Sequence, residues 1–408
     1  MNANDSTFKF AFIASLVFSF ILIFLSVSKE GFADDLYFSN ALTNRSLWTF
    51  LSFRYTEWSG RFFIELLTVT TINHSLFWKI GIPFCVIASS FLLWSICLRN
   101  SVPLRAGVLL SLVLILTINQ QILGEAHWWV TGFYNYLLPM TCALFVVDST
   151  IRGKISVSRI AASSILSLLA TSSEQIALGL MVVMLCLVIK RIVNKDANTS
   201  IAIIFAFVIT GALITFLSPG SSNRFAIESS RFMPFIGNMS ILQKATIGID
   251  RMTEFLATGI NITFIMCLMS FIFYVCKKCN SSKTSYLVIT LCIVAIAEQL
   301  IQGHRISGVE FISYEGKFIF TNFSSMHNYI TFSFYSVLLA VMSIGSIEDS
   351  EGKRDYSAAL CLILGTLLTI AIGMSPTAYA SSSRVLYVIS ICMILYTLFV
   401  FGRAIKKE

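Results

Sequence analysis

The sequence predicts an all-α polytopic membrane protein with about 12 transmembrane helices, and two observations predict it. First, 56% of the 408 residues are hydrophobic and only 12% are charged, whereas soluble domains carry ~25% charged residues. Second, the apolar residues gather in long runs, and a helix needs about 20 apolar residues to cross a bilayer. We therefore expect one membrane-embedded domain over residues 1–408 and no soluble domain.

Ten apolar runs of spanning length follow one another along the chain. They cover residues 8–28, 76–98, 106–123, 134–151, 199–217, 259–276, 285–302, 329–347, 357–373 and 385–401. The first run has no basic flank beyond Lys9, and Lys29-Glu30 follows it where a signal peptide would have a small-residue cleavage site. We therefore expect the first run to be a retained helix.

The stretch from Ile160 to Lys190 is too long for one helix and barely long enough for two. Basic clusters lie on both sides of it, around Arg152 and around Arg191. Because short cytoplasmic loops collect Lys and Arg, both clusters belong on the cytoplasmic side. The stretch then enters and returns as two short helices with Glu174 near the turn. This completes the 12 expected spans and places both termini in the cytoplasm.

Under this topology the inner loops are short and basic, whereas the outer segments are long and polar. Seventeen of the 29 Lys and Arg residues lie in the inner segments. The largest outer segments are 29–75, 218–258 and 303–328. The first of them mixes apolar, aromatic and charged residues, which predicts amphipathic helices on the outer membrane surface. Function is assigned to this outer side, because the short inner loops leave no room for a site.

Charge and motif content exclude several classes of function. The net charge of +8 comes from short clusters between apolar runs, so we read it as a topology signal and expect no nucleic-acid partner. All ten cysteines fall in apolar runs or at their predicted cytoplasmic ends, without a disulfide framework. The absence of a Gly-rich phosphate loop, an HExxH motif and a GxSxG motif argues against a nucleotide-driven enzyme.

Two adjacent carboxylates, Asp34 and Asp35, follow the first run directly. Adjacent carboxylates near apolar surface repel each other, which raises the apparent pKa of the pair and makes one of them a candidate general base. The alternative is that they cap the next helix. Two carboxylates can also hold a divalent cation, although no other metal-binding pattern accompanies them.

Arginines recur on the outer side in polar company, among them Arg61, Arg224 and Arg384. The positive-inside rule disfavours cations on the outer side, so their presence there requires a reason. Anion binding is one, because a guanidinium offers a two-pronged contact to phosphate. Interfacial snorkelling is the alternative. Glu174 is also a candidate, because a carboxylate close to the membrane is costly without a partner.

An aromatic segment precedes the run at 134–151. Trp128 and Trp129 lie beside Glu125 and His127. Tryptophans at membrane interfaces are commonly anchoring residues. The pair also suits stacking on a sugar ring.

Five segments of the chain follow one another in a characteristic order. They are Asp34-Asp35-Leu36-Tyr37, Ser59-Gly60-Arg61, Trp128-Trp129-Val130-Thr131-Gly132-Phe133-Tyr134-Asn135-Tyr136-Leu137-Leu138-Pro139, Ser173-Glu174-Gln175 and Pro219-Gly220-Ser221-Ser222-Asn223-Arg224. Together they resemble the multi-pass bacterial GT-C glycosyltransferases, including the phage-type Gtr proteins that convert serotype by decorating O-antigen in lipopolysaccharide. The similarity weakens after residue 230.

The resemblance implies an inverting transfer of a sugar, expected to be glucosyl, from a polyprenyl-phosphate donor such as undecaprenyl phosphate. The acceptor is a lipid-linked or cell-surface polysaccharide on the periplasmic face of the bacterial inner membrane. The implied roles are a general base for Asp34 or Asp35, donor phosphate binding for Arg61, Arg224 and Arg384, and sugar or acceptor binding for His127, Trp128, Trp129, Tyr136 and Glu174. The resemblance implies no definite cofactor, and a divalent cation is compatible with this chemistry.

Two other functions fit the same topology. An O-antigen polymerase also has about a dozen spans and outer arginines, and it differs in extending a chain rather than adding one residue. A lipid-linked sugar flippase or another transporter would place charges along the mid-membrane helices, where this sequence has few. For the transferase we expect membrane lipids, a companion flippase and a polyprenyl-phosphate glycosyltransferase as partners.

Overall fold

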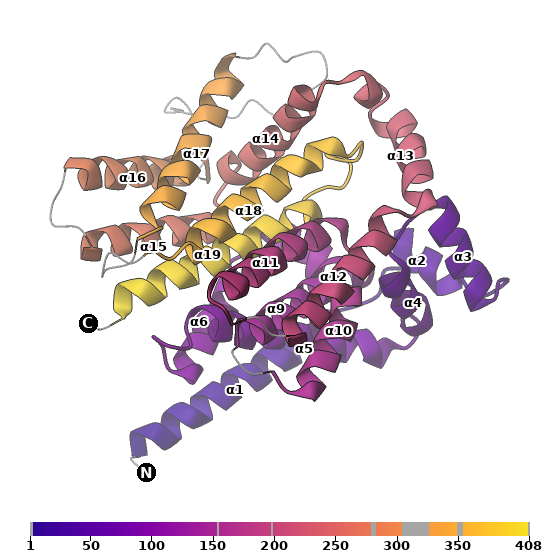
Figure 1. Ribbon diagram of the computed structural model, residues 1–408, viewed down its shortest axis with the longest axis horizontal. Helices are drawn as coiled ribbons and strands as arrows, with labels where there is room; N and C mark the ends of the chain where they lie inside the picture. Colours follow the sequence, from indigo (N-terminus) through magenta and orange to yellow (C-terminus); the bar gives the residue numbers. More distant parts are fainter. Residues whose placement is uncertain are drawn as a thin grey trace. The chain divides into compact units, whose positions relative to one another are not determined.

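A computed structural model describes residues 3–152, 155–196, 199–278, 283–303, 326–348 and 354–406 (Figure 1). Within these ranges the chain is helical and contains no β-strand, only an isolated antiparallel bridge between Glu348 and Arg354. Nine of the described helices are long and apolar enough to cross a membrane, or up to 11 if each of two bent helix pairs is one span. The prediction of a multi-pass helical membrane protein is confirmed, while the count of 12 stays a prediction.

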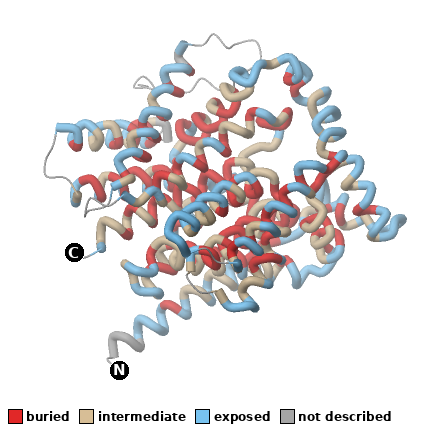
Figure 2. Tube along the Cα trace, in the orientation of Figure 1, coloured by how far each residue is buried: buried red, intermediate tan, exposed pale blue. Residues whose placement is uncertain are grey.

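The described helices pack into two compact units. The first unit contains Met1–Ile96, Leu104–Leu112 and Gln120–Ser230, and the second contains Cys97–Pro103, Val113–Asn119 and Arg231–Glu408. The single membrane-embedded domain over residues 1–408 stays a prediction. Buried residues run through the interior of each unit in Figure 2, whereas much of α1 and α16 is exposed. Exposed apolar faces on spanning helices are expected, because lipid tails cover them.

The first unit holds the amino-terminal helices and most of α6, α5 and α13. Its elements are α1 (Ala3–Ser26), α2 (Ala33–Asn40), α3 (Leu47–Glu57), α4 (Phe62–Thr71), α5 (Ser75–Cys97), α6 (Leu104–Leu116), α7 (Gln120–Leu123), η1 (Gly124–Trp128), α8 (Val130–Gly132), η2 (Phe133–Leu137), α9 (Leu138–Ile151), α10 (Val157–Ala170), α11 (Glu174–Val193), α12 (Thr199–Phe216) and α13 (Pro219–Phe232). Three short helices, α2 to α4, occupy the expected outer segment 29–75. Their position on a membrane surface stays a prediction.

The ambiguous stretch 160–190 forms two helices, as expected. Helix α10 has 14 residues, and α11 begins at Glu174 after a short turn. At 1.5 Å per residue α10 is about 21 Å long, which is shorter than the hydrocarbon core. It packs against α9 and α12. The turn between α10 and α11 places Glu174 at the start of α11.

One expected span is broken. The run 106–123 is not continuous, because α6 ends at Leu116 and the chain bends by 96° before α7 and η1. Thr117 closes α6 by donating its hydroxyl hydrogen to the Leu114 carbonyl at 2.7 Å. A hydroxyl that bonds back to its own helix competes with continuation of that helix. Apolar composition alone did not reveal this break.

The far end of α9 carries a compact ionic cluster, which we call the Asp148 cluster and define as Asp148, Arg152 and Arg159. Arg152 Nη2 lies 2.9 Å from Asp148 Oδ2, and Arg159 pairs with the same oxygen. Ser95 of α5 adds a hydrogen bond of 2.6 Å to Asp148 Oδ1. The two arginines that mark the predicted cytoplasmic side therefore also fasten α9 to the start of α10.

The second unit contains the carboxyl-terminal helices. Its elements are η3 (Ile236–Asn238), α14 (Ile241–Ala257), α15 (Ile262–Lys278), α16 (Lys283–Gly303), α17 (Met326–Gly345), α18 (Ser357–Ala371), η4 (Ile372–Met374), η5 (Arg384–Leu386) and α19 (Tyr387–Ile405). Helix α19 is the most buried candidate span and packs against α15 and α18. Most of the expected outer segment 303–328 lies outside the described residues.

The loop between η4 and η5 is held on α14. Tyr379 donates its phenolic hydrogen to Asp250 at 2.5 Å, and Arg251 Nη2 donates to the Ser382 carbonyl at 2.6 Å. Both Asp250 and Arg251 are buried. These contacts order the loop that leads to Arg384.

Candidate functional site

Polar side chains from five separate segments of the first unit form one continuous network. The segments are α2, the turn before α4, the irregular helix between 124 and 137, the start of α11 and the start of α13. They are the same five segments that carry the resemblance in the sequence. Their polar side chains lie at the end of the unit where α11 and α13 begin.

The network starts at Asp35, which is buried on α2. Its Oδ1 accepts hydrogen bonds from the Thr131 backbone N–H at 2.9 Å and from the Thr131 hydroxyl, and its Oδ2 accepts from the Glu30 N–H at 2.9 Å. Thr131 lies in the first turn of α8, where backbone N–H groups lack partners within the helix. Asp35 therefore caps α8, which is distant in sequence, rather than the helix next to it.

Asp34 lies in a different environment from its neighbour. It is exposed, and no hydrogen bond or ion pair joins it to another described residue. An exposed carboxylate with free acceptor oxygens can take a proton from a substrate hydroxyl, whereas Asp35 already accepts three hydrogen bonds. The geometry therefore favours Asp34 over Asp35 as the accessible base, and both roles stay predictions.

The segment from 124 to 137 is a helix with two π-helical turns and a break. The turns are η1 and η2, and Trp129 between them has an extended backbone with ψ of 128°. Such turns interrupt the regular helix and often accompany functional sites. Asn135, in the second turn, donates to the Thr131 carbonyl at 2.9 Å and accepts from Arg61 Nη1 at 3.1 Å. This amide connects the Asp35 contacts with Arg61.

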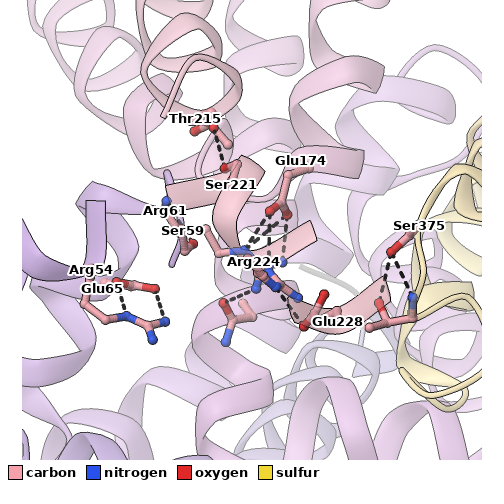
Figure 3. Close-up of polar contacts among 12 residues, drawn as sticks. Arg54, Ser59, Arg61, Glu65, Glu174, Thr215, Ser221, Arg224, Glu228 and Ser375 are labelled. Atoms are coloured by element: carbon pink, nitrogen blue, oxygen red, sulfur yellow. Dashed lines mark hydrogen bonds and ion pairs between the residues drawn. The ribbon is translucent and has the colours of Figure 1, made fainter. Parts of the chain in front are cut away.

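The centre of the network is a carboxylate between two arginines, which we call the Glu174 cluster and define as Arg61, Glu174 and Arg224. Arg61 donates to Glu174 through Nε at 3.1 Å to each oxygen and through Nη2 at 2.7 Å. Arg224 Nη1 lies 3.9 Å from Glu174 Oε1, and Arg224 Nε bonds Glu228 at 2.9 Å. Figure 3 shows these side chains turned toward one another.

The Glu174 cluster remains partly open to solvent. The side chains of Arg61, Arg224 and Glu174 are 22%, 24% and 37% exposed. Burial lowers the pKa of Arg61, but the Glu174 carboxylate beside it outweighs that effect and the pKa is raised above its usual value. Arg61 is therefore a permanent cation in this site.

Two glycines explain why the arginines meet. A Cβ added at Gly60 would lie 2.2 Å from the Thr215 carbonyl oxygen, and one at Gly220 would lie 2.4 Å from the Trp58 nitrogen. Neither position tolerates a side chain while the turn before α4 rests on the junction of α12 and α13. Ser218 strengthens this contact by donating to the Tyr55 carbonyl at 2.8 Å.

The remaining predicted site residues are placed around the network or away from it. His127 is buried in η1, with its ring edge-on to Trp128 at 5.4 Å. Trp128, Trp129 and Tyr136 are half-buried, and Tyr136 is close enough to influence the electrostatics of Arg61. Arg384 is half-buried at the first position of η5 in the second unit. The network itself thus joins Asp35, Arg61, Glu174 and Arg224 among the predicted residues.

Several contributing residues were not singled out from the sequence. Glu228 follows Arg224 by four residues on one helix, a spacing that predicts an ion pair and was the available signal. Arg54 forms a two-pronged pair with Glu65, at 2.9 and 2.6 Å, and its guanidinium lies over the Phe38 ring of α2. Both of these side chains are nearly buried, and the Arg54 guanidinium lies over the ring of Trp58. No local pattern indicated this second pair.

A metal centre is not assembled by the residues that the structure describes. Among them, no group of three or more His, Cys, Asp or Glu side chains is placed to hold a metal ion. The divalent cation that Asp34 and Asp35 can share stays a prediction.

Comparison with known proteins adds no relative. No protein-family model, no curated protein and no solved structure matches this chain. The similarity to GT-C glycosyltransferases stays a prediction that rests on the five segments.

Proposed function

We propose that this protein is an inverting glycosyltransferase of the GT-C type, which moves a sugar from a polyprenyl-phosphate donor to a polysaccharide or lipid-linked glycan. The observation that carries the proposal is the Glu174 cluster. Two arginines from different segments converge, partly exposed, at one end of a membrane-embedded helical unit. Paired guanidinium groups at such a place suit the phosphate of a lipid-linked substrate.

The resemblance to GT-C enzymes implies the reaction, and the charges in the site are compatible with it. The acceptor hydroxyl oxygen forms a bond to the anomeric carbon, and the bond between that carbon and the phosphate oxygen breaks. The hydroxyl proton passes to Asp34, which is exposed and free to accept it. The bonding electron pair leaves with the lipid phosphate, where Arg61 and Arg224 stabilise the added negative charge. Trp128, Trp129 and Tyr136 position the sugar and the acceptor.

Arg224 provides the test of the arginine role. Arg224→Lys keeps the positive charge but loses the planar fork, so we expect transfer to fall about 10-fold or more while expression and insertion persist. Arg231→Lys is the matched control, because Arg231 is exposed on the same helix α13 outside the network. The measurement is transfer of labelled sugar from a polyprenyl-phosphate donor in isolated membranes.

The competing functions give different results in the same assay. Normal transfer in Lys and Ala variants of both Arg61 and Arg224 would overturn the phosphate-binding role. Products that carry many added residues per acceptor would identify a polymerase. Movement of the intact lipid-linked sugar across the membrane without transfer would identify a flippase.

The proposed orientation places both termini in the cytoplasm and the site on the periplasmic side of the bacterial inner membrane. Reporter fusions after Arg152 and Lys195 should then report the cytoplasm, and fusions after Asn40 and Ser230 the outer compartment. An outer signal at Lys195 would mean that α10 and α11 cross only once together, which would invert the remaining spans.

A further inference from the structure

Glu174 occupies donors of Arg61 that an anion would use, and its charge lies 3.9 Å from Arg224 Nη1. Three of the five N–H groups of Arg61 are engaged, two by the Glu174 carboxylate and one by Asn135. Arg224 has only its Nε–H engaged among the described residues, by Glu228. A phosphate that reached both arginines would therefore meet a fixed negative charge at the same place.

The charge of the proposed ligand changes during the reaction. The lipid-linked donor is a phosphodiester with a single negative charge, whereas the released lipid phosphate is a monoester. A phosphate monoester carries about −1.5 to −2 charges at neutral pH. A neighbouring carboxylate repels the more highly charged product more strongly than it repels the donor.

We propose that Glu174 competes with the bound phosphate for Arg61 and Arg224 and thereby weakens binding of the lipid phosphate product. This inference rests on the proposed function and names a further role in the same site. Glu174 discriminates between a phosphodiester and a phosphate monoester. It also keeps the arginines ordered when no substrate is bound, because its carboxylate resembles the anion that replaces it.

Phosphate can replace the Glu174 carboxylate at the arginines because this carboxylate is partly exposed. The Glu174 side chain is 37% exposed, so water can solvate the carboxylate when a phosphate takes its donors. The Asp148 carboxylate also pairs with two arginines, but it is 2% exposed. That carboxylate has no access to solvent and cannot exchange its partners at low cost.

The first test measures binding without any transfer reaction. Inorganic phosphate is titrated into the detergent-purified full chain, the Glu174→Gln variant and a control variant, Glu57→Gln. Glu57 is exposed on α3 at the same end of the unit and bonds Asn223 rather than an arginine. We expect Glu174→Gln to bind phosphate about 10-fold more tightly and Glu57→Gln to bind it unchanged.

The second test uses steady-state transfer. Glu174→Gln should lower KM and kcat together, and inhibition by added polyprenyl phosphate should become stronger, because product leaves slowly. Unchanged or weaker phosphate binding, together with a raised KM, would overturn the proposal and leave Glu174 as a residue that only orders Arg61. Glu174→Ala provides a second variant if the glutamine protein does not accumulate.

Failure of this inference is distinguishable from failure of the proposed function. If Lys variants of Arg61 and Arg224 lose transfer but Glu174→Gln gains no affinity for phosphate, only the competition is wrong. If those arginine variants transfer normally, the phosphate site itself is wrong, and so is the role of Glu174 within it.

Discussion

The Asp148 cluster and the Glu174 cluster have the same composition but different surroundings. Each has one carboxylate with two arginines, and the four arginine side chains are similarly exposed, between 22% and 31%. The carboxylates differ, because Asp148 is 2% exposed and Glu174 is 37% exposed. Charge alone therefore does not separate a structural cluster from a candidate site. The two clusters are distinguished by how far solvent reaches the shared carboxylate.

The hydrogen bonds of the two carboxylates also differ, and the more buried carboxylate has more of them. Asp148 accepts from both arginines and from Ser95, so its oxygens are fully used inside the helix packing. Glu174 has close hydrogen bonds to Arg61 only, while Arg224 lies at 3.9 Å. The first arrangement fastens helix ends together. The second leaves donors available to a ligand.

The largest expected effect is on stability at the Asp148 cluster. Asp148→Ala removes a buried carboxylate that accepts from Arg152, Arg159 and Ser95 inside the helix packing, which should cost about 3–5 kcal/mol of folding free energy. Glu174→Ala should cost less than ~1 kcal/mol, because a partly exposed pair contributes little. Thermal unfolding of both variants in one detergent measures the difference. Equal losses would show that exposure does not distinguish the clusters.

Next in size is the rate effect expected at Asp34. Asp34→Asn removes the proton acceptor at nearly constant size, so transfer should fall by about 10² to 10⁴ with little change in thermal stability. The measurement is labelled-sugar transfer normalised to protein level. Wild-type rates in this variant would remove Asp34 from the mechanism and leave the proposed transfer without an assigned base.

A smaller effect is expected at Gly60, and it concerns the Glu174 cluster alone, because Gly60 precedes Arg61. Gly60→Ala places a Cβ against the Thr215 carbonyl, so the turn before α4 must move and carry Arg61 with it. We expect a cost of about 1–3 kcal/mol and reduced transfer. Gly31→Ala is the control, because a Cβ there meets nothing within 4 Å. Unimpaired transfer in Gly60→Ala would mean that Arg61 does not need this close packing.

The smallest expected effect concerns Asp35. Asp35→Asn can still cap α8 through its carbonyl oxygen, but its NH₂ group then faces the Glu30 N–H, so we expect a loss of about 1–2 kcal/mol. Thermal unfolding measures it beside Asp34→Asn. A loss of transfer without loss of stability in Asp35→Asn would reverse the roles given to the two carboxylates.

The sequence by itself determined the class of protein and indicated the five segments whose polar side chains meet in the fold. Runs of apolar residues predict spanning helices because the bilayer sets their length. The basic clusters on both sides of 160–190 predicted two helices there, and the structure has α10 and α11 in that stretch. The membrane side on which these clusters lie stays a prediction. The five segments that form the network were all identified locally, including Gly60-Arg61 and the turn that leads to Glu174.

Only the tertiary structure decided which residues meet and which are accessible. Asp35 is bonded to Thr131, 96 residues away, and Arg61 to Glu174, 113 residues away. No local pattern specifies such partners, because hydrogen bonds across the fold depend on how separate helices pack. Two adjacent aspartates thus lie in different environments, and the carboxylates of two similar charge clusters differ in exposure. The physical reason is that the exposure of a side chain depends on how separate helices pack around it, which the residue type alone does not specify.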